Sequence, residues 1–254
     1  NTVHPEWFEF FNQDHILTNL GEIAVSLYNN YQYWGRKDFK NKTGLQFFPY
    51  ESEIFLPFSI PVSSIKVVII GQDPYPNCYW SKTHNQYMPM AHGFAFSARD
   101  DCDTPPSLAN IFKELKQENL LETQSRSPNL EGWIDQGVML LNSALTAAPG
   151  EPGKHAKLWS GLIGEVIKFI DMKVPGTPIL MLGQKAGYFS NYAENSLTIV
   201  TQHPSPRVFN EYGYLAIDPK TKNKYILNNF SQRVFLGINE HLYNNGLNPI
   251  DWNL

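Results

Sequence analysis

Short apolar runs alternate along the chain with longer stretches in which apolar residues recur at helical spacing. The short runs are bounded by turn-forming residues and predict buried strands over 65–71, 93–97, 137–142, 178–183 and 197–203. The longer stretches predict helices over 108–118, 157–172 and 228–244, with a further N-terminal helix around Trp7, Phe8, Phe11 and Ile16. Regular alternation of strands and helices predicts a parallel sheet covered by helices on both faces.

The predicted sheet also indicates where a ligand would bind. In an open parallel sheet, ligands bind where the chain leaves the carboxyl ends of the strands. The residues at those positions are Gln72, Asp73, Ser97, Ala98, Asn142, Gly183, Gln184 and His203. They include a carboxylate, an amide and an imidazole, with the aromatic Phe96 beside them, so we expect chemically different groups to meet in one crevice.

Each of these groups also has a purely structural interpretation. Asp73 precedes a proline, which pushes it out of the helical region, so it could simply begin a turn. His203 lies in the rigid segment Gln202-His203-Pro204-Ser205-Pro206, where a lone histidine is more often structural. Asn142 ends an apolar strand and could cap a helix instead of reading a ligand. Taken one at a time, the motifs leave both readings open.

Composition narrows the class of protein. The chain has 254 residues, of which 42% are hydrophobic, which predicts a single large domain over 1–254 with a core of its own. Two cysteines without CxxC spacing and seven histidines without HExxH disfavour a disulfide scaffold or a common zinc site, and we expect no metal and no cofactor. The formal charge of −4 means that any DNA contact must be local.

Several motifs are absent or incomplete. The segment 149–154 hints at a phosphate-binding loop but lacks its first glycine and has His155 where Ser or Thr belongs. There is no GxGxxG and no GxSxG, which removes the sequence arguments for a dinucleotide enzyme or an α/β-hydrolase. No apolar stretch approaches the ~20 residues that span a bilayer, and the first residues lack a secretory signal, so we expect no membrane association and no secretion.

Two motifs together resemble family-1 uracil-DNA glycosylases. One is Gly71-Gln72-Asp73-Pro74-Tyr75 after an apolar strand, and the other is His203-Pro204-Ser205-Pro206. Further similar motifs follow in order along most of the chain: Ala91-His92-Gly93, Phe96-Ser97, Pro105-Pro106-Ser107-Leu108, Gly132-Trp133, Leu140-Leu141-Asn142 and Pro249-Ile250-Asp251-Trp252. The resemblance implies a three-layer α/β/α sandwich around a small, four-stranded, mainly parallel sheet.

The resemblance also implies an activity, namely metal-independent hydrolysis of the N-glycosidic bond between uracil and deoxyribose in DNA repair. It implies that Asp73 orients the attacking water and that His203 stabilises the anion developing on uracil. Asn142 would read the base, Phe96 would stack on it and Tyr75 would pack against C5, with Gln72 as a further contact. Such a set makes physical sense, because the reaction develops positive charge on the sugar and negative charge on the leaving base.

For DNA binding, the resemblance implies short loops that hold phosphates near the flipped nucleotide. The corresponding residues are Ser107, Gly183, Gln184, Ser205 and Arg207. Gln184 stands where the family usually has a small hydroxyl residue, Arg207 replaces a leucine that fills the gap left by the base, and Pro76 replaces a histidine. Two insertions, near 77–90 and 210–224, have no assigned role.

We therefore expect a monomeric DNA-repair enzyme inside the cell, wherever DNA is replicated or repaired, in the nucleus, the cytoplasm or a viral factory. Its partners would be single- and double-stranded DNA containing uracil and, by resemblance, a DNA-mimicking inhibitor protein. The alternative is a DNA-binding scaffold or replication-complex subunit of the same fold with little activity. A hydrolase of acyl or phosphate esters has no recognisable nucleophile motif. Retention of Asp73, Tyr75, Phe96, Asn142 and His203 together favours the enzyme.

Overall fold

The computed structural model describes residues 3–30, 33–122, 127–205 and 233–253. Its centre is a four-stranded sheet in the order β4-β1-β5-β6, and every pairing in it is parallel. The strands are β1 (Val67–Gly71), β4 (Val138–Asn142), β5 (Pro178–Leu182) and β6 (Leu197–Thr201). Because these strands are covered on both faces, they are apolar nearly throughout instead of alternating with polar residues.

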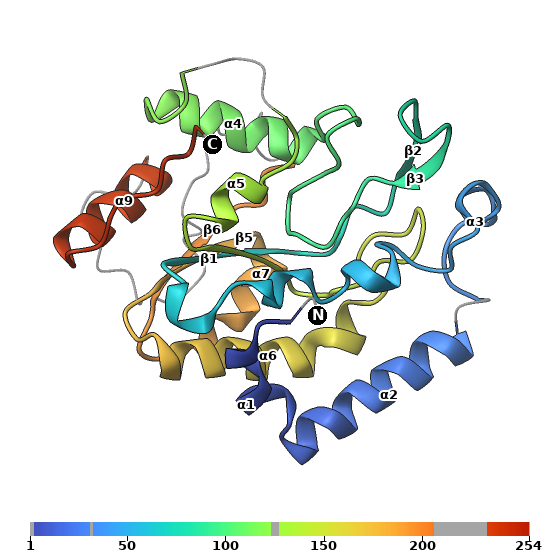
Figure 1. The fold of residues 1–254 in the computed structure, drawn as a ribbon, viewed down its shortest axis with the longest axis horizontal. Helices are drawn as coiled ribbons and strands as arrows, with labels where there is room; N and C mark the ends of the chain where they lie inside the picture. The colour runs from blue at the N-terminus through green and yellow to red at the C-terminus, as the bar shows by residue number, and fades with distance from the viewer. Residues whose placement is uncertain (1–2, 31–32, 123–126, 206–232, 254) are drawn as a thin grey trace.

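Helices cover the two faces of the sheet, which gives three layers (Figure 1). One face packs against α2 (Asp14–Asn30) and α6 (Ala156–Lys173), and the other against α4 (Pro106–Gln117), α5 (Glu131–Ile134) and α9 (Val234–Asn244). Alternation along β1 shows the same division, since Val68 and Ile70 join the first core and Val67 and Ile69 the second. The three-layer α/β/α sandwich expected from the sequence is confirmed.

Shorter elements complete the architecture. The remaining helices are α1 (Phe8–Phe11), α3 (Lys37–Thr43) and α7 (Gln184–Gly187), with 3₁₀ turns η1 (Pro5–Trp7), η2 (Glu51–Glu53), η3 (Leu56–Ser59), η4 (Val62–Ser64) and η5 (Tyr188–Tyr192). A separate two-stranded antiparallel sheet consists of β2 (Cys78–Ser81) and β3 (Gln86–Pro89). The insertion near 77–90, to which the sequence assigned no role, therefore forms a β-hairpin.

One predicted strand is wrong. Residues 93–97 form no strand, because Gly93 and Phe96 both have positive φ, 103° and 61°, which an extended strand does not accommodate. The four other predicted strands are present, and the helices expected over 108–118 and 157–172 correspond to α4 and α6. Of the helix expected over 228–244, residues 228–232 lie outside the described part of the chain, and α9 accounts for the remainder.

Candidate active site

The carboxyl ends of the four parallel strands bring most of the predicted site residues to one edge of the sheet. Gly71 at the end of β1 pairs with Asn142 at the end of β4, and Leu182 of β5 pairs with Thr201 of β6. The residues that follow these strands, Gln72-Asp73, Gly183 and Gln202-His203, therefore leave the sheet side by side. The sequence prediction of a rim at this edge agrees with the topology.

Gly71 allows the amide and the aromatic ring to reach the crevice. A Cβ at this position would lie 2.6 Å from Asn142 Oδ1, closer than real Cβ contacts, and 3.1 Å from Phe96 Cε2, which is a tight contact. Asn142 and Phe96 are both buried, at 2% and 8% exposure. The absence of a side chain on β1 thus leaves space in which an amide and a ring lie against the same stretch of backbone.

Hydrogen bonds from two other residues orient the Asp73 carboxylate. The backbone N–H of Gly153 donates to Asp73 Oδ2 over 2.6 Å, and the Gln72 side chain donates a second hydrogen bond. Burial raises the pKa of Asp73 above that of an ordinary aspartate, although Gly153, Gln72 and the Lys185 ammonium each lower it. The site therefore contains a desolvated carboxylate that is oriented by donors, which is the state that a charge-stabilising group needs.

His203 lies against Gly183, at the start of α7. Gly183 has a φ of +103°, and a Cβ there would lie 3.1 Å from the Cβ of His203. The Ser205 N–H donates to His203 Nδ1 over 3.1 Å, which makes Nδ1 an acceptor and leaves the proton of a neutral ring on Nε2. Burial, followed by the Lys185 charge, lowers the pKa of His203, so the ring is mostly neutral near pH 7.

Two aromatic residues of the site, Tyr75 and Phe96, are linked by a hydrogen bond, and we call this pair the aromatic wall. The Tyr75 hydroxyl donates to the backbone carbonyl of Phe96 over 2.8 Å, and this bond joins the loop after β1 to the segment 91–98. The centroid of the Phe96 ring lies 6.2 Å from that of His203. Burial raises the pKa of Tyr75, so its hydroxyl stays protonated and the bond to Phe96 is retained at neutral pH. The wall is thus fixed beside the imidazole.

The predicted DNA-contact residues are only partly brought together. Gly183, Gln184 and Ser205 lie at the carboxyl edge beside His203. Ser107 lies in the first turn of α4, and Asn110 of the same helix donates to the Pro204 carbonyl over 3.0 Å, which ties α4 to the His203 loop. Arg207 and the insertion near 210–224 lie outside the described residues.

The sequence interpretation missed two contributions to the site. The segment 149–154 was compared only with a phosphate loop, yet its Gly153 N–H holds the Asp73 carboxylate. The sequence interpretation gave Lys185 only a general part, as one of several positive charges at the rim. Its Nζ would lie 2.8 Å from a Cβ on Gly153, and its charge acts on both Asp73 and His203. The signal in the sequence was the position of Lys185 three residues after the end of β5.

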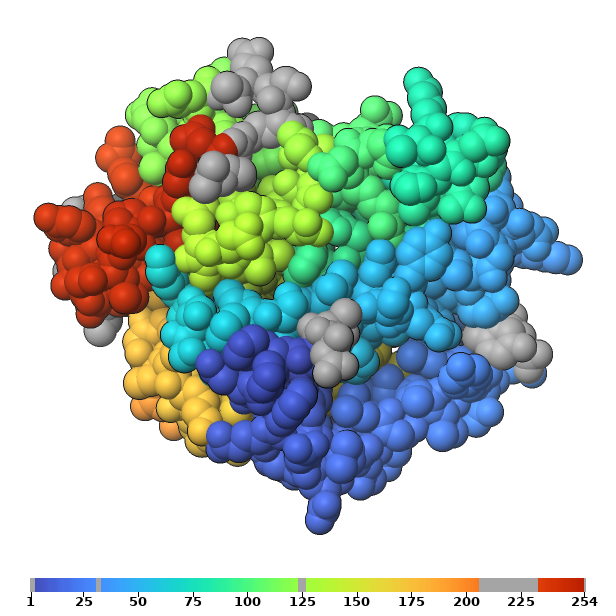
Figure 2. All heavy atoms as spheres, in the orientation of Figure 1, coloured from blue at the N-terminus to red at the C-terminus, as the bar shows by residue number. Residues whose placement is uncertain are grey.

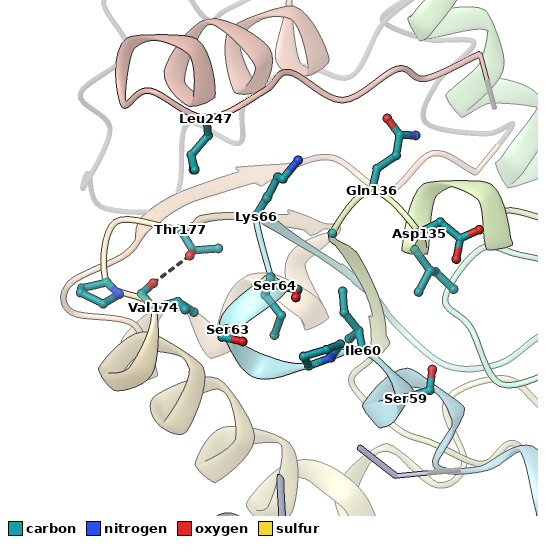
Figure 3. A pocket seen from close by; sticks show the side chains of 15 residues that line it. Ser59, Ile60, Ser63, Ser64, Lys66, Asp135, Gln136, Val174, Thr177 and Leu247 are labelled. Atoms are coloured by element: carbon teal, nitrogen blue, oxygen red, sulfur yellow. Dashed lines mark hydrogen bonds between the residues drawn. The ribbon is translucent and has the colours of Figure 1, made fainter. Parts of the chain in front are cut away.

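A separate cleft lies at the opposite edge of the sheet (Figure 3). Its volume is about 780 Å³. Its walls include Lys66, Gly137 and Thr177, each of which immediately precedes the first residue of a strand. None of the predicted site residues lines it. This cleft and the convergence of reactive groups therefore lie at different ends of the molecule.

The described residues offer neither a metal-binding cluster nor a membrane-spanning helix. They contain no group of three or more His, Cys, Asp or Glu side chains arranged to hold a metal ion. Within the same ranges, no helix combines the length and the apolar character that crossing a membrane requires.

Comparison with known sequences gives a consistent answer. The family model of the uracil DNA glycosylase superfamily matches residues 58–228. A uracil-DNA glycosylase of Sulfurimonas denitrificans is 33% identical over 208 residues, which are 81% of this chain and 82% of the relative. One of Shouchella clausii is 32% identical over 240 residues, which are 92% of this chain and 90% of the relative.

Solved structures agree with the sequence comparison. The crystal structure of mimivirus uracil-DNA glycosylase covers all of this chain and 88% of its own, with a TM-score of 0.77 and 28% identity. A variant of the mimivirus protein in complex with UGI superposes with a TM-score of 0.79 at 28% identity, covering all of this chain and 90% of its own. The motifs, the fold and these similarities lead to one conclusion: the chain belongs to the uracil-DNA glycosylase superfamily.

Proposed function

We propose that this chain removes uracil from DNA by hydrolysing the N-glycosidic bond, and that Asp73 and His203 are its catalytic residues. The observation that carries this proposal is the position of a desolvated carboxylate and a neutral imidazole at one edge of the sheet, next to a buried amide and a fixed aromatic wall. Membership of the superfamily supports the same reaction.

Asp73 would act on the sugar side of the bond. As the bond to uracil breaks, the sugar becomes oxocarbenium-like, and a nearby carboxylate stabilises the positive charge and orients the attacking water. Gly153 and Gln72 hold the carboxylate by hydrogen bonds, so little reorganisation is needed when charge develops. The raised pKa of Asp73 has a consequence for activity, since acid conditions remove the charge at a higher pH than for an ordinary aspartate.

His203 would act on the base side. Its Nδ1 accepts the Ser205 N–H, so the neutral ring presents Nε2–H as a donor to the uracil O2 on which negative charge develops. The Phe96 ring lies beside the imidazole and offers a flat surface for the base. The Asp73 carboxylate would thus face the positive charge on the sugar, and the His203 Nε2–H would face the negative charge on the base.

Asn142 and Tyr75 would select uracil. An amide accepts from uracil N3–H and donates to O4, whereas cytosine presents an acceptor and a donor at those positions and leaves both groups unpaired. Each such buried mismatch costs about 1–3 kcal/mol. Thymine differs from uracil by one methyl group, and the Tyr75 ring, fixed by its bond to Phe96, would occupy the space that this methyl needs.

DNA binding would be local. The base must leave the stack to reach the crevice, at a cost of a few kcal/mol that is lowest for unpaired bases. Ser107, Gly183, Gln184 and Ser205 would contact phosphates around the extruded nucleotide, with Arg207 entering the stack, and Lys185 would add a positive charge at the rim. Contacts of this kind position DNA without a strongly basic protein surface.

Three further properties belong to the same proposal. The reaction would need no metal ion, because the carboxylate and the imidazole supply the stabilisation. The chain would act as a monomer in a compartment that holds DNA, and a DNA-mimicking inhibitor protein would block it. The last point is supported by the mimivirus relative that was crystallised in complex with UGI.

The test is release of free uracil from uracil-containing single- and double-stranded oligonucleotides in buffer with EDTA. We expect release from both and loss of release in Asp73→Asn. A scaffold would bind the oligonucleotides without releasing uracil, and activity that EDTA abolishes would overturn metal independence.

A further inference from the structure

The β2–β3 hairpin lies in the chain between two aromatic residues of the proposed uracil pocket. Its two ends lead to Tyr75 on one side and to Phe96 on the other, and these residues are hydrogen-bonded to each other. Cys78, the first residue of β2, is five residues after Asp73 and so lies at most about 18 Å from it. The hairpin is therefore within a few nucleotides of any base held in the crevice.

One face of the hairpin is fastened to the body of the protein. The Tyr79 hydroxyl and the Ser81 hydroxyl both donate to the Asp101 carboxylate, and Ser81 is fully buried. Met88, which pairs with Tyr79 across the hairpin, is buried as well. Because side chains alternate between the faces of a strand, the residues between these ones must point the other way.

The opposite face presents an exposed aromatic side chain beside a cation. Trp80 is 48% exposed, and its only described ring contact is the edge of Tyr87, 5.2 Å between centroids, its partner across the hairpin. Lys42 of α3 places its Nζ 5.1 Å from the centroid of the Tyr87 ring. We call the side chains of Trp80, Tyr87 and Lys42 the hairpin face.

The charges around the hairpin face are mainly positive. Arg36 and Lys42 of the α3 region and Lys82 of the hairpin turn are exposed. The one acidic group of α3, Asp38, is engaged by Arg36 through two bonds of 3.1 and 3.0 Å. Asp101 lies on the fastened face of the hairpin. A chain with a formal charge of −4 thus carries a local positive excess here.

The hairpin face is physically continuous with the proposed active site. The Arg36 N–H donates to the Pro149 carbonyl over 2.6 Å, and the Gly150 N–H donates to the Pro76 carbonyl over 2.7 Å. The same loop ends at Gly153, which holds Asp73. Figures 1 and 2 show α3 and the hairpin meeting at one corner of the molecule, where they pack against each other.

We propose that the hairpin face binds the unpaired DNA strand that flanks the extruded uridine, with a base stacked on Trp80 and phosphates held by Lys42 and Lys82. This inference rests on the proposed function and adds a second contact region to it. Aromatic stacking and cations in a rigid frame are the means by which proteins bind single strands without reading sequence. In a duplex the bases are already stacked, so Trp80 has no free base to accept.

The experiment compares kcat/KM on single-stranded oligonucleotides in which uracil has two neighbours on each side with longer ones extended on the 5′ or the 3′ side. For the unaltered chain, we expect extension on one side to raise kcat/KM. In Trp80→Ala, kcat/KM on the extended oligonucleotide should be about tenfold lower than in the unaltered chain. The same variant should match the unaltered chain on the short oligonucleotide and on a uracil-containing duplex.

Matched variants separate stacking from a general loss of structure. Trp80→Phe should restore most of the gain because it keeps a ring, whereas Trp80→Leu should not. Lys42→Gln should reduce the slope of log(kcat/KM) against log salt by about 0.7 on long single strands. Tyr243→Ala and Lys168→Gln, at exposed positions on α9 and α6, should change neither quantity.

Two results would overturn the inference. One is a kcat/KM that does not depend on flank length in the unaltered chain, and the other is an equal response to length in Trp80→Ala. In either case, continued uracil release from the short oligonucleotide would leave the proposed function standing and would make the hairpin face a site for a protein partner instead. Absence of uracil release from every oligonucleotide would count against the proposed function itself.

Discussion

The two edges of the central sheet use polar residues in opposite ways. At the amino edge, where the cleft of Figure 3 lies, polar side chains hold the protein together: Gln136 exchanges two hydrogen bonds with the backbone of Asp251, and Ser63 is bonded to Glu6. At the carboxyl edge, Asp73 and His203 are partly desolvated and oriented, and none of the described residues bonds to His203 Nε2. The availability and orientation of its polar groups distinguish the edge that carries the proposed active site.

The strongest way to break this comparison is to make the same substitution at both edges. Asp73→Asn removes the carboxylate charge without changing its shape, and we expect kcat for uracil release to fall by at least about a hundredfold. Affinity for uracil-containing DNA should stay within about twofold. Asp135→Asn in the amino-edge cleft is the matched control and should leave kcat unchanged. A near-normal kcat in Asp73→Asn would remove Asp73 from the mechanism.

A second pair of substitutions tests whether the carboxyl edge reads the base. Asn142→Asp should admit cytosine, because a protonated carboxyl donates to cytosine N3 while its other oxygen accepts from N4. Tyr75→Ala should separately admit thymine. In each case release of the new base should rise by about tenfold or more over the unaltered chain, measured by chromatography of free bases.

Tyr75→Phe is the control for this pair. It loses the hydrogen bond to Phe96 but keeps the ring, so it should still reject thymine. If Asn142→Asp and Tyr75→Ala release neither cytosine nor thymine from DNA, the crevice is not the base pocket.

Two glycines with positive φ differ in what a side chain would meet. Gly183 lies against His203, whereas nothing lies within 4 Å of a Cβ on Gly176, next to the amino-edge cleft. Both Ala variants should lose at least about 1 kcal/mol of unfolding free energy, and Gly183→Ala should lose more, because its backbone conformation is one that glycine alone readily adopts. Only Gly183→Ala should also lower kcat, by about tenfold, because the new methyl group displaces the imidazole. Equal kcat values in the two variants would show that His203 needs no such fit.

The smallest expected effect concerns Lys185. Its ammonium lowers the pKa of both Asp73 and His203, so Lys185→Met should raise both. Activity needs Asp73 ionised and His203 neutral, so the acid limb of the kcat/KM profile should move to higher pH. At neutral pH the loss should be about threefold to fivefold, since an exposed charge contributes ~1 kcal/mol or less.

Lys66→Met, in the amino-edge cleft, is the matched control and should shift nothing. A pH profile of Lys185→Met that superposes on that of the unaltered chain would mean that this lysine only binds phosphate. In that case its effect would appear in KM and in the salt dependence alone.

The sequence by itself determined the parallel sheet and the edge that carries the candidate site. Apolar runs such as Val67–Ile70 are buried on both faces only in a sheet covered by helices, and the residues after such strands must emerge at one edge. The sequence pattern therefore predicts that Asp73, Asn142 and His203 lie near one another. Helical periodicity is likewise visible among neighbouring residues, which is why the predicted bounds of α4 and α6 are close to the observed ones.

The tertiary structure alone decided which partners complete that edge. Gly153 is 80 residues from the carboxylate that it holds, and Lys185 reaches the same loop from α7. The segment 93–97 is apolar like a strand, but positive φ at Gly93 and Phe96 turns it so that the Phe96 ring meets Gly71 and His203. These contacts join segments that are distant in the chain, and periodicity reports only on near neighbours. The physical reason is that hydrogen bonds and close packing between distant segments depend on how the layers assemble.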